Sequence, residues 1–187
     1  MDKVLLKPAN ALFPVPAVLV TSRLGDGEPN IIAIAWTGVM NNNPPMVYVA
    51  VQPSRYSHRL IKESGEYVIN IPSVDMARIV DYCGMVSGRD VNKFKETGLT
   101  PLAASQVKAP LIKECPVNLE CKVREVLSLG SHDVFIGEVV AVHADKDVLG
   151  EKGSPDLDKF KPCAFCMGEY WGLKERIGSY GFSKKGS

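Results

Sequence analysis

The spacing of the first three apolar strands is the feature that most restricts the fold of this chain. Residues 17–21 form a predicted strand, and residues 29–36 return as a second strand after the Asp26-Gly27 turn. Residues 46–51 form a third strand that is almost wholly apolar. A parallel crossover needs roughly a dozen or more residues between strands, and neither connection is that long. The chain is therefore predicted to begin as an antiparallel sheet.

The rest of the chain continues this mainly β pattern, with short helices in between. Further strands are predicted at residues 67–71, 117–123 and 134–144, the last two joined by a turn containing Gly130. Helices are predicted at residues 55–63, capped by Ser54 and ended by Gly65, at residues 74–83, and from Asp90, with residues 99–114 mostly loop. We predict an antiparallel barrel with helices packed outside. Residues 1–187 form one domain, with a tail from about residue 145 that wraps the surface or a partner subunit.

The composition argues against several broad classes of function. Apolar residues make up 45% of the 187 residues, which is enough for a full core. The net charge of +1 gives no field that would hold nucleic acid. No apolar run reaches the length of a membrane span, and residues 1–8 contain no apolar signal-peptide region. We expect a cytoplasmic protein without a nucleic-acid or membrane partner.

Cysteines, histidines and glycine-rich turns supply few conventional catalytic motifs. The five cysteines are an odd number, which argues against a disulfide scaffold. Cys163 and Cys166 form a C-x-x-C with three open interpretations: two unrelated thiols, a thiol role beside a cofactor, or zinc. The histidines lack neighbours at metal-ligand spacing, so no metal site is expected, and two of them read as ordinary polar residues, His132 and His143. No P-loop, nucleophile elbow or complete dinucleotide fingerprint occurs.

Two segments carry the chemistry that a phosphate group requires. Residues 85–95 supply a hydroxyl, flexible backbone N–H groups and two cations within seven residues, namely Ser87, Gly88, Arg89 and Lys93. Similar chemistry occurs in residues 52–58, which follow an apolar strand and open a helix. Because neither segment is a P-loop, the pair favours a phosphorylated cofactor held by scattered contacts.

A series of short segments follows one another in an order that is specific, although no single segment is decisive. The segments are residues 13–21, 29–30, 35–38, 44–45, 67–72, 87–94, 119–121 and 135–139. This series resembles the flavin reductase-like family of FMN-binding split barrels and, within it, the flavoredoxin group. The resemblance covers about residues 10–145, with a weaker match through Trp171.

The resemblance implies a split β-barrel homodimer with one FMN per subunit, bound near the dimer interface. It implies that residues 35–38 lie along the isoalloxazine ring and that the two segments above surround the phosphate. The cofactor-binding residues expected on this basis are Ala35, Trp36, Thr37, Gly38, Asn41, Gln52, Ser54, Arg55, Ser57, His58, Ser87, Gly88, Arg89 and Lys93. Asn41 stands where relatives often carry Ser or Thr. The C-x-x-C is not carried over from the family.

The family likeness implies redox chemistry that belongs to the cofactor, so no catalytic side chain is assigned. The expected function is passage of electrons from NADH or NADPH through FMN to an acceptor. The alternative is a flavoredoxin-type FMN electron carrier, served by a redox protein partner and without nicotinamide activity of its own. A third option is a flavin-binding module inside a larger redox assembly.

Overall fold

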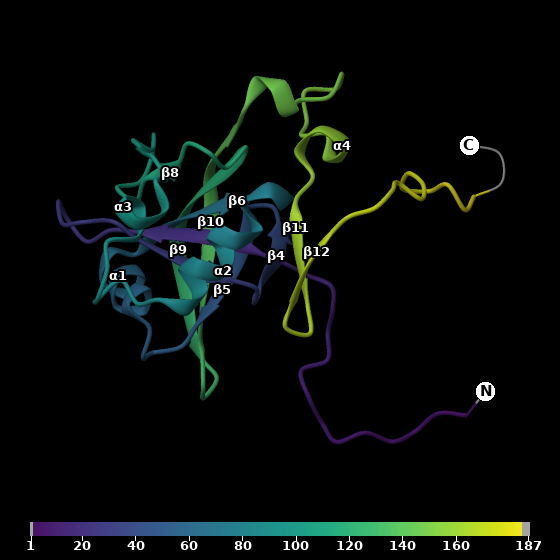
Figure 1. Ribbon diagram of the computed structural model, residues 1–187, viewed down its shortest axis with the longest axis horizontal. Helices are drawn as coiled ribbons and strands as arrows, with labels where there is room; N and C mark the ends of the chain where they lie inside the picture. Colours follow the sequence, from purple (N-terminus) through teal and green to yellow (C-terminus); the bar gives the residue numbers. More distant parts are fainter. Residues whose placement is uncertain (1, 185–187) are drawn as a thin grey trace.

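The structure is a computed structural model that describes residues 2–184, and its polypeptide is mainly β with short helices (Figure 1). The strands are β1 (Val15–Pro16), β2 (Val18–Ser22), β3 (Asn30–Ile34), β4 (Thr37–Asn42), β5 (Pro45–Val51), β6 (Glu66–Ile71), β7 (Pro101–Leu102), β8 (Leu111–Ile112), β9 (Val117–Ser128), β10 (Asp133–Ala144), β11 (Cys163–Cys166) and β12 (Glu169–Gly172). The helices are α1 (Tyr56–Ser64), α2 (Ala77–Met85), α3 (Lys93–Thr97) and α4 (Leu157–Phe160), with short 3-10 turns η1 (Val74–Met76) and η2 (Lys146–Val148).

Seven strands form one antiparallel sheet in the order β3-β2-β6-β9-β10-β5-β4. Strands β3 and β5 are not hydrogen bonded to each other, yet they are in contact, because the sheet curls on itself. Their inward side chains share one core with those of the strands between them, including Ile32, Val49 and Phe135. The predicted antiparallel barrel is therefore confirmed.

A second core lies on the outer face of β2 and β3. All five residues of β2 are buried, because Val18 and Val20 face the barrel interior while Leu19 faces outward. Leu19 and Ile31 pack there with Val80 of α2 and with other residues of the helical layer. This two-sided burial explains why the strand reads as a continuous apolar run.

A small three-stranded sheet, β1-β11-β12, joins the two ends of the chain. Strand β1 pairs with β11 through Val15 and Phe165, and β11 continues into β12 as a hairpin. Phe160 of α4 is buried against Val117 and Val148, so residues of the tail pack on the body of the same chain. The extreme N-terminal and C-terminal segments extend away from the body (Figure 1).

Several local predictions were wrong. Ser54 does not cap α1, because Arg55 is the N-cap residue and its helix start has no side-chain cap. The short helix does not begin at Asp90: Asn92 is the N-cap of α3, and its side chain accepts from the Lys95 N–H at 3.2 Å. Strand β4 was not predicted, whereas residues 99–114 are mostly loop as expected, apart from the two-residue strands β7 and β8. The helix end at Gly65 is confirmed by its left-handed backbone.

Candidate functional site

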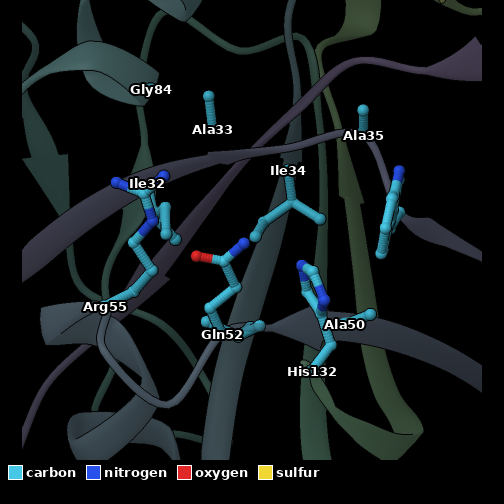
Figure 2. Close-up of a pocket in the computed structure, with 11 residues that line it drawn as sticks. Ile32, Ala33, Ile34, Ala35, Ala50, Gln52, Arg55, Gly84 and His132 are labelled. Atoms are coloured by element: carbon cyan, nitrogen blue, oxygen red, sulfur yellow. The ribbon is translucent and has the colours of Figure 1, made fainter. Parts of the chain in front are cut away.

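Two adjoining hollows lie between β3, the end of β5, the start of α1 and the end of α2. Ile32, Arg55 and Gly84 line both, so the two hollows share one wall. The first hollow has a volume of about 190 Å³ and is also lined by Ala33, Ile34, Ala35, Trp36, Ala50, Val51, Gln52 and His132 (Figure 2). The second has a volume of about 150 Å³ and is also lined by Asn30, Ser54, Tyr56, Ser57, Cys83, Val86, Ser87, Gly88, Arg89 and Lys93.

The second hollow is positively charged. Arg55, Arg89 and Lys93 line it, and no carboxylate is among its lining residues. Hydroxyl groups from three serines accompany these cations, Ser54, Ser57 and Ser87. Cations and hydroxyl donors without a counter-charge form a binding site for an anion such as a phosphate group.

A tight turn at residues 87–89 holds one side of the second hollow. The Arg89 N–H donates to Ser87 Oγ at 3.2 Å, and Arg89 Nη1 donates to the Ser54 carbonyl at 2.9 Å. The Arg89 guanidinium also lies 5.7 Å from the centroid of the Tyr56 ring. These contacts bring residues 52–58 and 85–95, the two segments predicted to bind phosphate, together in one site.

Asn30 forms the floor of this site. Its side chain is buried, and Nδ2 donates to Ser57 Oγ at 2.7 Å. A Cβ atom added at Gly88 would overlap the amide of Asn30, so the turn can approach the strand this closely only with glycine. Asn30 therefore sets the distance between the turn and α1.

Lys93 is buried at the back of the second hollow, with 4% of its surface exposed. Its ammonium donates to the Cys83 carbonyl at 2.6 Å. Burial lowers the pKa of Lys93 to about 8, with the neighbouring positive charge of Arg55 acting in the same direction. The protonated form of Lys93 is therefore destabilised as long as no anion lies beside it.

The first hollow has an apolar and aromatic wall. The rings of Trp36 and His132 lie with their centroids 4.3 Å apart and tilted by 37°. Burial, with Arg55 adding to its effect, lowers the pKa of His132, so the imidazole is neutral at pH 7. Figure 2 shows Gln52 between Arg55 and His132, with its amide in the same space. Two aromatic rings and an amide side chain in one hollow suit a planar ring ligand that carries polar atoms on its edge.

Ten of the fourteen expected cofactor-binding residues line these two hollows, and four do not: Thr37, Gly38, Asn41 and His58. Thr37 Oγ1 donates to the Tyr48 carbonyl at 2.5 Å, and Gly38 lies against the Tyr48 ring. Asn41 Nδ2 donates to the Pro44 carbonyl at 2.9 Å. These contacts order the strand and turn that follow Trp36.

His58 is buried behind the hollows. Its Nε2 donates to Asp133 Oδ2 at 2.8 Å, and its ring meets Phe135 edge to face at 5.2 Å. The hydrogen bond with His58 lowers the pKa of Asp133. Asp133 follows His132 directly, so the His58–Asp133 pair fixes the start of β10, where His132 enters the first hollow.

Sequence reasoning missed several lining residues. His132 was expected to be an ordinary polar residue of a hairpin turn, but it lies against Trp36. Asn30, Tyr56 and Gly84 were not singled out as site residues, yet each lines a hollow. The Asn30-Ser57 contact crosses from β3 to α1, and no local pattern signals it. The available signals were the position of Asn30 at the start of an apolar strand and the place of residues 29–30 among the segments that carry the family resemblance.

Cys163 and Cys166 lie outside both hollows, on β11. Residues three apart on a strand point to opposite faces, so these two thiols do not face each other. Cys163 Sγ donates to the Ser73 carbonyl at 3.3 Å, and all five cysteines are free. Within residues 2–184 no cluster of His, Cys, Asp or Glu could hold a metal ion. No helix in that range is long and apolar enough to cross a membrane.

This chain belongs to the flavin reductase-like family, because the family model described as "Flavin reductase like domain" matches residues 10–173. Its fold is similar to that of flavoredoxin of Desulfovibrio vulgaris (Miyazaki F), with a TM-score of 0.91 and 35% identity over 97% of this chain and 98% of the other. Flavoredoxin from Methanosarcina acetivorans gives a TM-score of 0.88 and 33% identity over 98% of both chains. A protein of Archaeoglobus fulgidus is 37% identical over 79% of this chain and 81% of its own length. The family and the split-barrel fold expected from the sequence are thereby confirmed.

Proposed function

We propose that the protein binds FMN in the two hollows and passes electrons from NADH or NADPH through it to an acceptor. The observation that carries this proposal is that a cationic hollow adjoins an aromatic one and shares lining residues with it. Arg55, which lines both, supports a ligand that has an anionic group at one end and a flat ring at the other. The similarity to FMN-binding proteins and flavoredoxins makes FMN the ligand of choice.

The residues present fit this group. Arg55, Arg89 and Lys93, with the hydroxyls of the second hollow, would hold the phosphate. Because Gly88 has no Cβ, its turn can pack directly on Asn30, which would hold Ser87 and Arg89 at the edge of the phosphate site. Ala35, Trp36, Gln52 and His132 would lie beside the ring. The second hollow offers one phosphate site, and the sequence carries no complete dinucleotide fingerprint, which favours FMN over FAD.

Bound FMN would supply the hydride and electron chemistry, and the residues of this chain bind, orient and shield it. Trp36 and His132 would cover one part of the bound ring. Neutral His132 adds no charge there, and Arg55 supplies the positive potential between the hollows. The four expected residues outside the hollows would either position the lining residues or contact FMN directly when it is bound. They are Thr37, Gly38, Asn41 and His58.

The second candidate is a flavoredoxin-type electron carrier without nicotinamide activity. The nearly full-length similarity to two flavoredoxins favours it. In that case a redox protein partner, and not a nicotinamide, would deliver electrons. The exposed edge of the first hollow, where Trp36 is 43% exposed, is the surface at which either donor would approach.

We further propose that the protein works as a cytoplasmic homodimer of single-domain subunits spanning residues 1–187. Support for the dimer comes from exposed apolar side chains of β4 and β10, Val39, Met40 and Val142, beside an apolar groove. Support for the location comes from five cysteines that are all thiols.

The decisive experiment is an absorbance spectrum of the purified protein, followed by release of the cofactor and its chromatographic identification. FMN is expected, and recovery of FAD, haem or no cofactor contradicts the proposal. Anaerobic mixing with NADH or NADPH then separates the two candidates. Fast bleaching of the flavin supports the reductase, whereas reduction only by a protein donor supports the carrier.

A further inference from the structure

The three cations of the second hollow are not equivalent. The side chains of Arg55 and Arg89 reach solvent, whereas Lys93 is 4% exposed and lies behind them. Like charges that share one hollow repel each other, and the repulsion is strongest for a charge that water does not screen. Lys93 is therefore the cation whose charge depends most on what occupies the hollow.

The groups that face Lys93 do not neutralise it. From α2, the Cys83 carbonyl accepts its hydrogen bond, and the Cys83 thiol stays protonated because burial raises its pKa to about 11. From the start of α1 it faces the positive charge of Arg55 and the neutral Ser57. The neutral Asn30 of β3 and the cation Arg89 of the 87–89 turn line the same hollow as Lys93. The carboxylate of Glu28 accepts from Asn92, outside the hollow.

We propose that Lys93 couples the binding of a doubly charged phosphate monoester in this hollow to the uptake of one proton at alkaline pH. The proposal rests on FMN, or another phosphate monoester, being the ligand of the site. An arginine at this place would stay charged at all relevant pH values, whereas a buried lysine can release its proton when the hollow is empty. Riboflavin has the same ring but no phosphate, so its binding places no negative charge beside Lys93 and does not favour the protonated form.

The lowered pKa of Lys93, about 8 in the empty hollow, gives the pH range of the effect. A phosphate dianion beside the ammonium raises this pKa again, because an opposite charge favours the protonated form. Well below pH 8 Lys93 is protonated in both states, so affinity does not depend on its titration. Well above pH 8 the free protein must take up a proton to bind, so affinity falls by a factor that approaches about tenfold per pH unit. The phosphate itself, with a second pKa of about 6, no longer titrates there.

The test is isothermal titration of the apoprotein with FMN at pH 7.0, 8.5 and 9.0 in pairs of buffers that differ in ionisation enthalpy. We expect almost no proton uptake at pH 7.0, and at pH 9.0 an uptake approaching one proton with about tenfold weaker binding than at pH 7.0. Riboflavin should bind without proton uptake at every pH. Proton uptake that does not change between pH 7.0 and 9.0 overturns the role of Lys93.

Variants assign the proton to Lys93. Lys93→Arg and Lys93→Met should both abolish the uptake at pH 9.0, and Lys95→Arg, on the same helix but exposed, should leave it unchanged. If both Lys93 variants fail to fold, proton uptake by the unaltered protein still tests the linkage. Uptake must then accompany the binding of FMN at pH 9.0 and be absent for riboflavin. FMN binding without uptake refutes only the linkage. Absence of FMN binding at every pH refutes the proposed function as well.

Discussion

Gly88 lies directly over the side-chain amide of Asn30, so closely that a Cβ atom at position 88 would overlap it. Asn30 begins β3 and donates to Ser57 Oγ at 2.7 Å, whereas Gly88 belongs to the turn after α2. The contact therefore connects strand, turn and helix α1 at the floor of the second hollow. The close packing of Gly88 on Asn30 therefore sets whether Arg55, Arg89 and Lys93 can all contact the same ligand.

The first prediction concerns Gly88→Ala. The added methyl group must displace either the turn or Asn30, which moves Ser87 and Arg89 away from the hollow. We expect FMN affinity to fall by at least about tenfold, corresponding to roughly 1.4 kcal/mol. Fluorescence titration of the apoprotein measures it. The control is Gly150→Ala, where a Cβ would meet only ordinary contacts, and an equal effect of both variants would refute the role of the close approach.

The second prediction compares Arg55 and Arg89, which line the second hollow, with Arg59, which does not. Arg89 and Arg59 each lie 5.7 Å from the centroid of Tyr56, but only Arg89 lines the second hollow. A charge-assisted bond to phosphate is worth roughly 1.5–3 kcal/mol. Arg55→Ala and Arg89→Ala should therefore each weaken FMN binding by about 10- to 150-fold. Arg59→Ala should bind FMN as the unaltered protein does, and unchanged affinity in the other two would make these arginines structural only.

The predictable part of the fold is the part encoded by local patterns. The Asp26-Gly27 turn between two apolar runs predicted the β2–β3 hairpin, which the structure confirms. Strand β4 escaped prediction because it is an edge strand whose last four side chains are exposed, so it lacks the alternation of a half-buried strand. Strand β11 escaped because its pairing with β1 joins the two ends of the chain, and no local pattern records that contact.

The same distinction applies to the site. Ser87, Gly88 and Arg89 were recognised because the required groups lie side by side in the sequence, and the structure brings them to one hollow with Ser54. His132 was missed because its role depends on Trp36, which reaches it only through the folding of the barrel. Residues that act through long-range contacts carry no signal in a single sequence.

Glu120 anchors the loop that precedes β8. The side chain is fully buried on β9, and its oxygens accept from the backbone N–H groups of Ser105, Gln106 and Val107 and from Ser105 Oγ. His143 Nε2 lies 2.6 Å from Oε1. Burial alone would raise the pKa of Glu120, but the hydrogen bonds from Ser105, His143 and Gln106 outweigh it and hold the pKa at about 2.

The third prediction follows from this carboxylate. Its pKa is lower in the folded chain than the unfolded value of about 4.3, so its stabilisation is present above pH 4.3 and is lost as the pH falls towards 2. Glu120→Gln should lower the free energy of unfolding by about 2–4 kcal/mol at pH 7 and flatten the acid limb. Urea unfolding between pH 2.5 and 7 measures both. Glu138→Gln, which removes an exposed ion pair with Arg124, should cost less than about 1 kcal/mol. Equal losses in the two variants would contradict the anchoring role.

The fourth prediction concerns Cys163 and Cys166. Their Cα atoms are three strand residues apart, roughly 10 Å, whereas a disulfide needs about 4.4–6.8 Å. We expect the double Cys→Ser variant to keep its FMN and to bleach with NADH or NADPH within a few-fold of the unaltered rate. Serine at position 163 can still donate to the Ser73 carbonyl. Retained FMN with a large loss of bleaching would show that the thiols relay electrons.

The fifth prediction tests the homodimer through Val39. This side chain is 80% exposed on the edge strand β4 and borders an apolar groove formed with β5, β9 and β10. In a monomer Val39→Glu would cost almost nothing, because the carboxylate stays in water. In a dimer that covers the groove, the same change buries an unpaired charge and should shift the protein to a monomer at micromolar concentration. Leu157→Glu, at a 55% exposed position on α4, is the control and should leave the sedimentation unchanged. A monomer that already holds FMN without any substitution would contradict the proposed assembly.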